Sequence, residues 1–223
     1  MDKKLFHFTK FARLVYIIGV HTICLGQTMF SVFKFTKATP AKSMFSTPLA
    51  VLMLAALMGL SACSTTPPEG MSPVSPFDIT RYVGKWYEIA RLDHSFERDL
   101  SDVSATYSQQ DDGSVKVINR GYSIKHADWR EAIGRALFTG DTDRASLKVS
   151  FFGPFYGGYH VVALDQQNYR WAMVVGPDRD YLWILSKDKQ LAPAVREQLL
   201  AQARSQGIDV SKLIWVSQTR DDG

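Results

Sequence analysis

The chain has 223 residues, of which 46% are hydrophobic and 22% charged, so it is long enough for one domain with a sizeable core. Its two cysteines exclude a disulfide-dense scaffold and a four-thiolate zinc site. The formal charge of +4 does not indicate nucleic-acid binding, because residues 1–63 hold seven of the 26 basic side chains and one of the 22 acidic ones. Residues 64–223 are left with 19 basic and 21 acidic side chains, which disfavours a polyanion-binding surface.

Residues 1–62 are predicted to be a secretory leader. The segment from Pro48 to Leu60 is thirteen residues long and carries no charge. As a helix it would span about 20 Å, short of the roughly 30 Å hydrocarbon core of a bilayer. Lysines precede it and small residues follow it, which is typical of a secretory signal. Met29 or Met44 would each start a more ordinary signal, so the first residues are expected to lie outside the functional leader.

The end of the leader, Leu60-Ser61-Ala62-Cys63, resembles the bacterial lipobox. This resemblance implies that Cys63 is lipidated and becomes the mature N-terminus; the alternative is an ordinary signal with a cysteine near its end. Ser64 after the cysteine implies retention in the outer membrane. Two or more acyl chains make a stable anchor where one would be marginal. Residues 63–76 are expected to be the lipidated cysteine and a flexible tether rich in Pro, Ser and Thr.

After Phe77, short apolar segments alternate with turn signals, which predicts a series of β-strands. The turn signals include Asp111-Asp112-Gly113, Gly153-Pro154 and Gly157-Gly158. Within the segments apolar and polar residues alternate, as they do from Leu147 to Phe151. Eight strands are expected, near residues 85–92, 102–109, 114–122, 130–139, 144–152, 158–164, 169–175 and 180–187.

One helix and one further strand are expected after these eight. Residues 193–206 begin with Pro and contain good helix formers, and Gly207 follows as a stop signal. A last short strand is expected at 213–216. This order favours an all-β fold, an eight-stranded antiparallel up-and-down barrel, because closure removes both sheet edges. A barrel of this size holds either packed side chains or one small ligand, and composition leaves the choice open.

The start of the first strand, Gly84-Lys85-Trp86, resembles the Gly-x-Trp signature of the lipocalins. Further segments resemble the same family: Ala105-Thr106-Tyr107-Ser108, Val117 to Tyr122, Ser150 to Tyr159, and Asp178 to Ser186. The resemblance covers residues 77–218 and leaves 219–223 as a C-terminal tail. It is closest to the bacterial outer-membrane lipoprotein lipocalins and more distant from apolipoprotein D.

The resemblance implies structural roles for Gly84, Trp86 and Lys187. In the family a short 3₁₀ turn closes the barrel floor, and the tryptophan of the first strand packs inside it. The family usually has Arg where Lys187 stands, stacked on that tryptophan. Lys retains a cation–π contact worth about 0.5–2 kcal/mol, but it loses the planar stack and some hydrogen-bond donors.

The resemblance also implies which residues face the cavity. The strand alternation supports this, because Phe151 shares its parity with Val149, and Leu185 shares its parity with Trp183. Alternatively each fills a solid core, and an inward Asn would then bond a neighbouring side chain. Glu88 has the inward parity of Trp86 and is expected to pair with an Arg. The six cavity-facing residues are Tyr107, Asn119, Phe151, Tyr159, Trp183 and Leu185.

The sequence predicts no catalytic residue, no metal site and no cofactor. His94, His126 and His160 lack ligand spacing and are expected at the surface or the rim. There is no Gly-x-Ser-x-Gly, phosphate-binding or dinucleotide-binding motif, although a triad from distant residues is not excluded by motifs alone. The apolar hairpin Phe152-Tyr156 would suit closure of the cavity, a membrane contact or a dimer contact, and the sequence does not choose.

Together the resemblances imply a lipoprotein anchored at the periplasmic face of the outer membrane that binds a long-chain fatty acid or a lysophospholipid in its barrel, for lipid transport or storage. Whether the chain forms a homodimer stays open. Two alternatives also stay open. One is a lipocalin-fold enzyme acting on a small apolar substrate, which would need a reactive side chain in the cavity. The other is a structural envelope lipoprotein with a filled barrel and no ligand.

Overall fold

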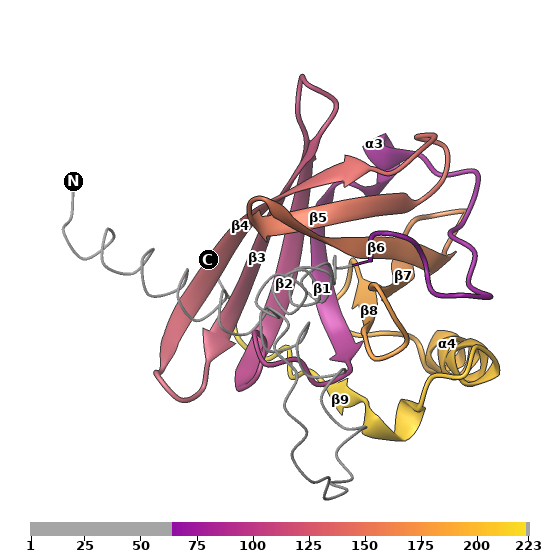
Figure 1. Ribbon diagram of the computed structural model, residues 1–223. Helices are drawn as coiled ribbons and strands as arrows, with labels where there is room; N and C mark the ends of the chain where they lie inside the picture. Colours follow the sequence, from indigo (N-terminus) through magenta and orange to yellow (C-terminus); the bar gives the residue numbers. More distant parts are fainter. Residues whose placement is uncertain (1–63, 222–223) are drawn as a thin grey trace, which may run out of the picture. The chain divides into compact units, whose positions relative to one another are not determined.

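The computed structural model describes residues 64–221, so the predicted leader and Cys63 lie outside the described residues. Within that range no helix is both long and apolar enough to cross a bilayer. Residues 64–221 form a short helix α3 (Ile79–Tyr82), nine strands, a helix α4 (Pro193–Ser205) and a 3₁₀ turn η1 (Val210–Lys212) (Figure 1). The strands are β1 (Gly84–Arg91), β2 (Leu100–Gln109), β3 (Val115–Ser123), β4 (Asp128–Phe138), β5 (Ser146–Phe152), β6 (Phe155–Leu164), β7 (Trp171–Val175), β8 (Leu182–Ser186) and β9 (Ile214–Trp215).

Strands β1 to β8 form a closed antiparallel barrel. Each strand pairs with the next along the chain, and β1 pairs with both β8 and β2, which closes the sheet. The strands of this barrel therefore have a hydrogen-bonded neighbour on each side, and the edge that an open sheet would expose is removed. The prediction of an eight-stranded up-and-down barrel with a C-terminal helix and a last short strand is confirmed.

The apolar residues separate into two cores, one inside the barrel and one outside it. On β7 and β8, Ala172, Val174 and Leu185 pack with the inner cluster, whereas Met173 and Ile184 pack with the outer one. This alternation follows from the period of two along a strand. The outer core is closed by helix α4, which lies beside β7 and β8 in Figure 1. The buried residues of helix α4 are Leu199, Leu200 and Ala203.

The pair Gly157-Gly158, predicted as a turn, lies inside β6. The hairpin turn before it is formed by Gly153-Pro154 alone. A Cβ atom on Gly158 would lie 2.6 Å from Nε2 of His160 and 3.4 Å from the carbonyl oxygen of Ser64. The glycine is therefore explained by a close approach of neighbouring groups to the strand and not by a turn conformation.

That close approach is made by the segment predicted as a flexible tether. Its described part, residues 64–76, lies along the barrel: Gly158 donates its backbone N–H to the Ser64 carbonyl oxygen at 3.1 Å, and Val74 donates to Val161 at 2.8 Å. Met71 is buried in the outer core. Backbone hydrogen bonds and the buried Met71 thus hold residues 64–76 on the barrel, although their composition is typical of a flexible segment.

The C-terminal segment fills the gap where β1 and β2 diverge. Strand β9 pairs with the end of β1, and the Gln218 amide donates to the carbonyl oxygens of Glu88 on β1 and Val103 on β2, both at 2.8 Å. The Asp102 carboxylate accepts bonds from the backbone N–H groups of Thr219 and Arg220 and from the Arg220 guanidinium. Residues 214–220 therefore complete the barrel wall between β1 and β2.

Candidate functional site

The inner face of the barrel is apolar and aromatic, and it is the candidate ligand site. It combines side chains from β2, β5, β6 and β8 in a single cluster, separate from the core under helix α4. Five of the six residues predicted to face a cavity belong to this cluster, and they come from all four of these strands. The five are Tyr107, Phe151, Tyr159, Trp183 and Leu185.

Asn119, the sixth predicted residue, lies on β3 opposite Ala105 of β2 and Ala132 of β4. It has the parity of the buried residues Val115 and Val117, so it lies on the inner face. The residue is half-buried. It adds one amide group to the inner face, and its contact with a ligand stays a prediction.

The closed end of the barrel is sealed around Trp86. This side chain is fully buried and donates its indole N–H to the Tyr82 carbonyl oxygen at 2.6 Å. Lys187 lies with Nζ 4.4 Å from the centre of the Trp86 ring and donates to the Val83 carbonyl oxygen at 2.6 Å. Burial lowers the pKa of Lys187 to about 8. Gly84 has φ +93°, a conformation that favours glycine, and a Cβ there would lie 3.4 Å from Nζ of Lys187.

Three tyrosine hydroxyls meet inside the barrel above Trp86. The Tyr159 hydroxyl lies 2.7 Å from that of Tyr82 and 2.8 Å from that of Tyr107. Burial raises the pKa of all three phenols, so each stays neutral and can both donate and accept a hydrogen bond. The cluster therefore places neutral polar groups at the deep end of the barrel, among aromatic and aliphatic side chains.

Replacing Tyr159 by phenylalanine is expected to lower the free energy of unfolding by about 1–3 kcal/mol, because two buried hydroxyls lose their shared partner. Urea denaturation measures this change. Tyr156→Phe is the control, since Tyr156 lies on the outside of β6 with Lys148 over its ring, a contact that phenylalanine keeps. Equal stability of Tyr159→Phe and the parent protein would contradict the assigned role.

A buried charged cluster lies in the other half of the barrel, toward the β1–β2 loop. Arg91 donates Nη1 to the Glu88 carboxylate at 2.7 Å and Nη2 to the Glu97 carbonyl oxygen at 2.8 Å. The Glu97 carboxylate accepts from the Trp183 indole N–H at 3.1 Å and lies 3.6 Å from Nε of Arg91. The expected pairing of Glu88 with an Arg is confirmed.

Two carboxyl groups share a single guanidinium in this cluster, and all three side chains are at least nine-tenths buried. Burial raises the pKa of Glu88, and burial together with the nearby Glu88 raises the pKa of Glu97 well above its usual value. As the pH rises, the folded protein therefore keeps a proton on this cluster up to a higher pH than the unfolded chain does.

The proton uptake predicts how stability depends on pH. The folded-state pKa of Glu97 is raised, so its protonation contributes to the free energy of unfolding. This contribution is fully present below about pH 4.5 and is lost as the pH rises through the folded-state pKa. The loss is at most about 1.4 kcal/mol per pH unit. Glu97→Gln keeps an acceptor for Trp183 and is expected to flatten this fall. Urea unfolding across a pH series checks it, and Glu197→Gln, on the exposed face of α4, is the control. Parallel profiles for the Glu97→Gln and parent proteins would refute the prediction.

Two of the three histidines predicted at the surface are buried. His94, in the β1–β2 loop, stacks on Tyr181 at 4.4 Å and on Phe96 at 5.4 Å, while His160 on β6 lies under residues 64–66. Burial lowers the pKa of each to about 4, so both are neutral. His126 is exposed as predicted. No group of three or more potential metal ligands occurs among residues 64–221.

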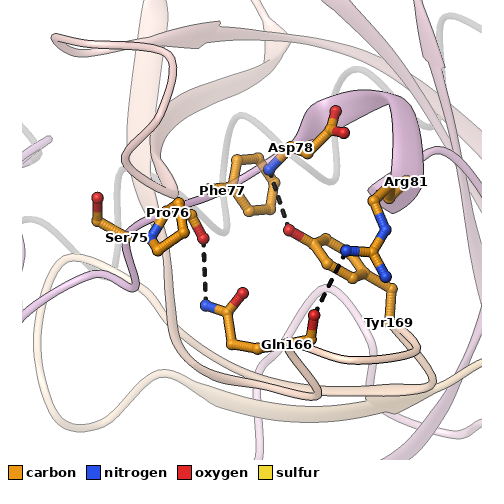
Figure 2. A pocket seen from close by; sticks show the side chains of 7 residues that line it. All are labelled: Ser75, Pro76, Phe77, Asp78, Arg81, Gln166 and Tyr169. Carbon is orange, nitrogen blue, oxygen red and sulfur yellow. Dashed lines mark hydrogen bonds between the residues drawn. The ribbon is translucent and has the colours of Figure 1, made fainter.

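A pocket of about 380 Å³ lies at the outside of the closed end (Figure 2). The guanidinium of Arg81 covers the Tyr169 ring at 4.1 Å. The Tyr169 hydroxyl accepts a hydrogen bond from the Asp78 N–H at 3.0 Å. The Gln166 amide donates to the Pro76 carbonyl oxygen at 3.1 Å. These polar groups bond to one another, so the pocket fixes the segment before β1 against the β6–β7 loop. Its lining residues are Ser75, Pro76, Phe77, Asp78, Arg81, Gln166 and Tyr169.

Comparison with known proteins identifies relatives over the whole barrel. A family model described as a lipocalin-like domain matches residues 77–218. The outer membrane lipoprotein Blc of Escherichia coli (strain K12) is 54% identical over 171 residues, which is 77% of this chain and 96% of that protein. Temperature-induced lipocalin-1 of Arabidopsis thaliana is 34% identical and covers 66% of this chain and 83% of its own. The structure of insecticyanin from the tobacco hornworm Manduca sexta is similar with a TM-score of 0.57 at 25% identity, covering 69% of this chain and 87% of that one.

Proposed function

The chain belongs to the lipocalin family, and on that premise we propose that it is an outer-membrane lipoprotein that binds a lipid inside its barrel. The relative in Escherichia coli carries the name outer membrane lipoprotein, and this chain matches 96% of its length. The lipobox resemblance at Cys63 supports the same location independently of the barrel. The protein acts by binding, and no residue is assigned a catalytic role.

The observation that carries the ligand assignment is the apolar inner face. Aromatic and aliphatic side chains from four strands meet there, and Trp86 seals one end. Such a site suits a single acyl chain, whose tail lies along the apolar wall while its polar head stays toward the open end. The proposed ligand is a long-chain fatty acid or a lysophospholipid, held for transport or storage in the envelope.

The energetics allow this assignment. Burying about sixteen methylene groups gives a gross transfer free energy on the order of 13 kcal/mol, against association costs of about 4–15 kcal/mol. The acyl chain supplies most of the affinity, and polar groups near the mouth supply selectivity. The proposed lining is Tyr107, Asn119, Phe151, Tyr159, Trp183 and Leu185.

Native mass spectrometry of residues 64–223, titrated with fatty acids and lysophospholipids, tests the ligand assignment. One-to-one adducts are expected, and Trp183→Ala and Tyr159→Ala should weaken them in variants that stay folded by circular dichroism. Trp129→Ala is the matched control, because Trp129 lies on the outer face of β4 under Arg120. No adduct with any acyl ligand, from folded protein, would reject the proposal.

Lipidation of Cys63 is tested separately by expressing the full chain in a Gram-negative host. The parent protein is expected in the outer-membrane fraction with a mass increase that corresponds to acyl chains. Cys63→Ser is expected to lose both the mass increase and the membrane association. Retention of Cys63→Ser in the membrane fraction would show that the anchor lies elsewhere.

A further inference from the structure

Two large apolar side chains are exposed at the same end of the barrel. Ile124 follows β3 in the β3–β4 turn and is 63% exposed, and Phe155 begins β6 after the β5–β6 turn and is 47% exposed. In an up-and-down barrel these two turns and the β1–β2 loop lie at one end, the end opposite Trp86. The exposed pair therefore lies at the end of the barrel where the proposed ligand would enter, which we call the open rim.

Aromatic side chains lie close to both residues. Below Ile124, Tyr122 and Trp129 pack edge to face, with ring centres 5.5 Å apart on the outer wall. Phe152 stacks with Phe155 at 6.5 Å on the other hairpin. Tyr and Trp, which have an apolar ring and a polar group, are favoured where lipid meets water, and the exposed Lys125 beside Ile124 has a long side chain that suits contact with head groups.

The start of the described chain lies beside this rim. The Ser64 carbonyl oxygen accepts the Gly158 N–H, and Gly158 lies three residues, or about 10 Å of strand, from Phe155. Cys63 precedes Ser64 directly in the sequence. Because residues 64–76 are bonded to the barrel, they leave no long free linker between an acylated Cys63 and the β5–β6 hairpin.

We infer that the open rim of the barrel docks onto a phospholipid surface, with Ile124 and Phe155 inserted among the lipids. This inference rests on the proposed lipidation of Cys63, since acyl chains at that position hold the β5–β6 side of the rim at the membrane and the Trp86 end away from it. The mouth then opens at the lipid surface, and an acyl ligand passes between leaflet and barrel without a separate step through water.

Site-directed fluorescence on the lipidated protein tests the docking. Ile124→Cys and Phe155→Cys are labelled with an environment-sensitive probe, and the protein is reconstituted into vesicles of phosphatidylethanolamine and phosphatidylglycerol. The introduced cysteine is the thiol to be labelled, because Cys24 belongs to the predicted leader and the thiol of Cys63 is expected to be acylated. Both probes are expected to shift to the blue and to be quenched by spin-labelled lipids.

Two control positions sharpen the result. Ile133→Cys replaces an isoleucine that is 56% exposed on the outer wall of β4, about 17 Å of strand from Asp128 at the open end. Asp111→Cys lies in the β2–β3 turn at the closed end. Both probes are expected to stay in water. If the protein sediments with the vesicles but the probes at positions 124 and 155 emit as they do in water, the docking is wrong and the anchor is not affected. If the protein does not stay with the vesicles, both the anchor and this orientation are wrong.

A second copy of the chain is the competing occupant of the rim. If the blue shift at position 124 fades as the protein is diluted into more lipid, the contact is between copies and the inference is wrong. The double variant Ile124→Asp/Phe155→Asp is expected to slow uptake of a fluorescent lysophospholipid from vesicles by about tenfold or more, because two apolar insertions are lost. Its affinity for the same lipid in solution is expected to be unchanged, and Ile133→Asp should alter neither. Unchanged uptake from vesicles in the double variant would contradict the inference.

Discussion

Replacing Arg91 by methionine is expected to lower the free energy of unfolding by about 3–5 kcal/mol at pH 7, because a buried charge cluster loses its only guanidinium. Glu88 and Glu97 would remain buried with no cation between them. Their folded-state pKa values, already raised, would rise further, so stability should recover as the pH falls toward about 4.5 and both carboxyl groups become protonated. Urea unfolding at pH 7 and pH 5 measures the recovery.

The matched control is Arg135→Met, which removes an exposed ion pair with Asp112 on the outer wall. Both partners are more than half exposed, so the expected loss is below about 1 kcal/mol and should depend little on pH. Similar losses in the two arginine variants, or a loss in Arg91→Met that persists unchanged at pH 5, would show that the cluster does not act through charge compensation.

Replacing Trp86 by alanine is expected to cost about 3–5 kcal/mol, since it leaves a cavity at the closed end of the barrel. The variant also loses the indole bond to the Tyr82 carbonyl oxygen and the contact beneath Lys187. Calorimetry and near-ultraviolet circular dichroism would show a lower unfolding temperature and a weaker aromatic signal.

Trp215→Ala provides the comparison for Trp86. Trp215 is 39% exposed on β9, and its ring is covered on one face by the Arg196 guanidinium at 3.5 Å. An exposed cation–π contact is worth about 0.5–1 kcal/mol. The free energy of unfolding should therefore fall several times less in Trp215→Ala than in Trp86→Ala. Equal losses would mean that the closed end of the barrel does not carry the stability assigned to it.

The strand pattern of the barrel could be predicted from the sequence because period-two alternation and turn residues act locally. The helix expected at 193–206 is found at Pro193–Ser205, and most strand limits agree within two residues. The exception is β6, expected to begin at residue 158 and found to begin at Phe155. The glycines before Tyr159 signal a turn locally, but Gly158 lies inside the strand and contacts Ser64, which is far away in the sequence.

The aromatic part of the candidate site also followed from alternation and family resemblance, and so did the inward position of Glu88, whereas the positions of Arg91 and Glu97 did not. Counting by twos from Trp86 places Glu88 inward and Arg91 outward. The register of β1 against β8 shifts between Glu88 and Ala90, which brings Arg91 opposite Trp183 on the inner face. A β-bulge of this kind reverses the parity of the residues that follow it, and no residue in this strand signals it.

The C-terminal segment has a consequence for biosynthesis. Asp102 and Thr219, joined by a 2.6 Å bond, are 117 positions apart in the sequence. A secreted chain emerges from its N-terminal side, so β1 and β2 reach the periplasm long before the residues that fill the gap between them. Until then the edges of both strands stay partly unpaired and open to contacts with other chains. The contacts that cover these strand edges therefore form only after residues 214–220 have arrived.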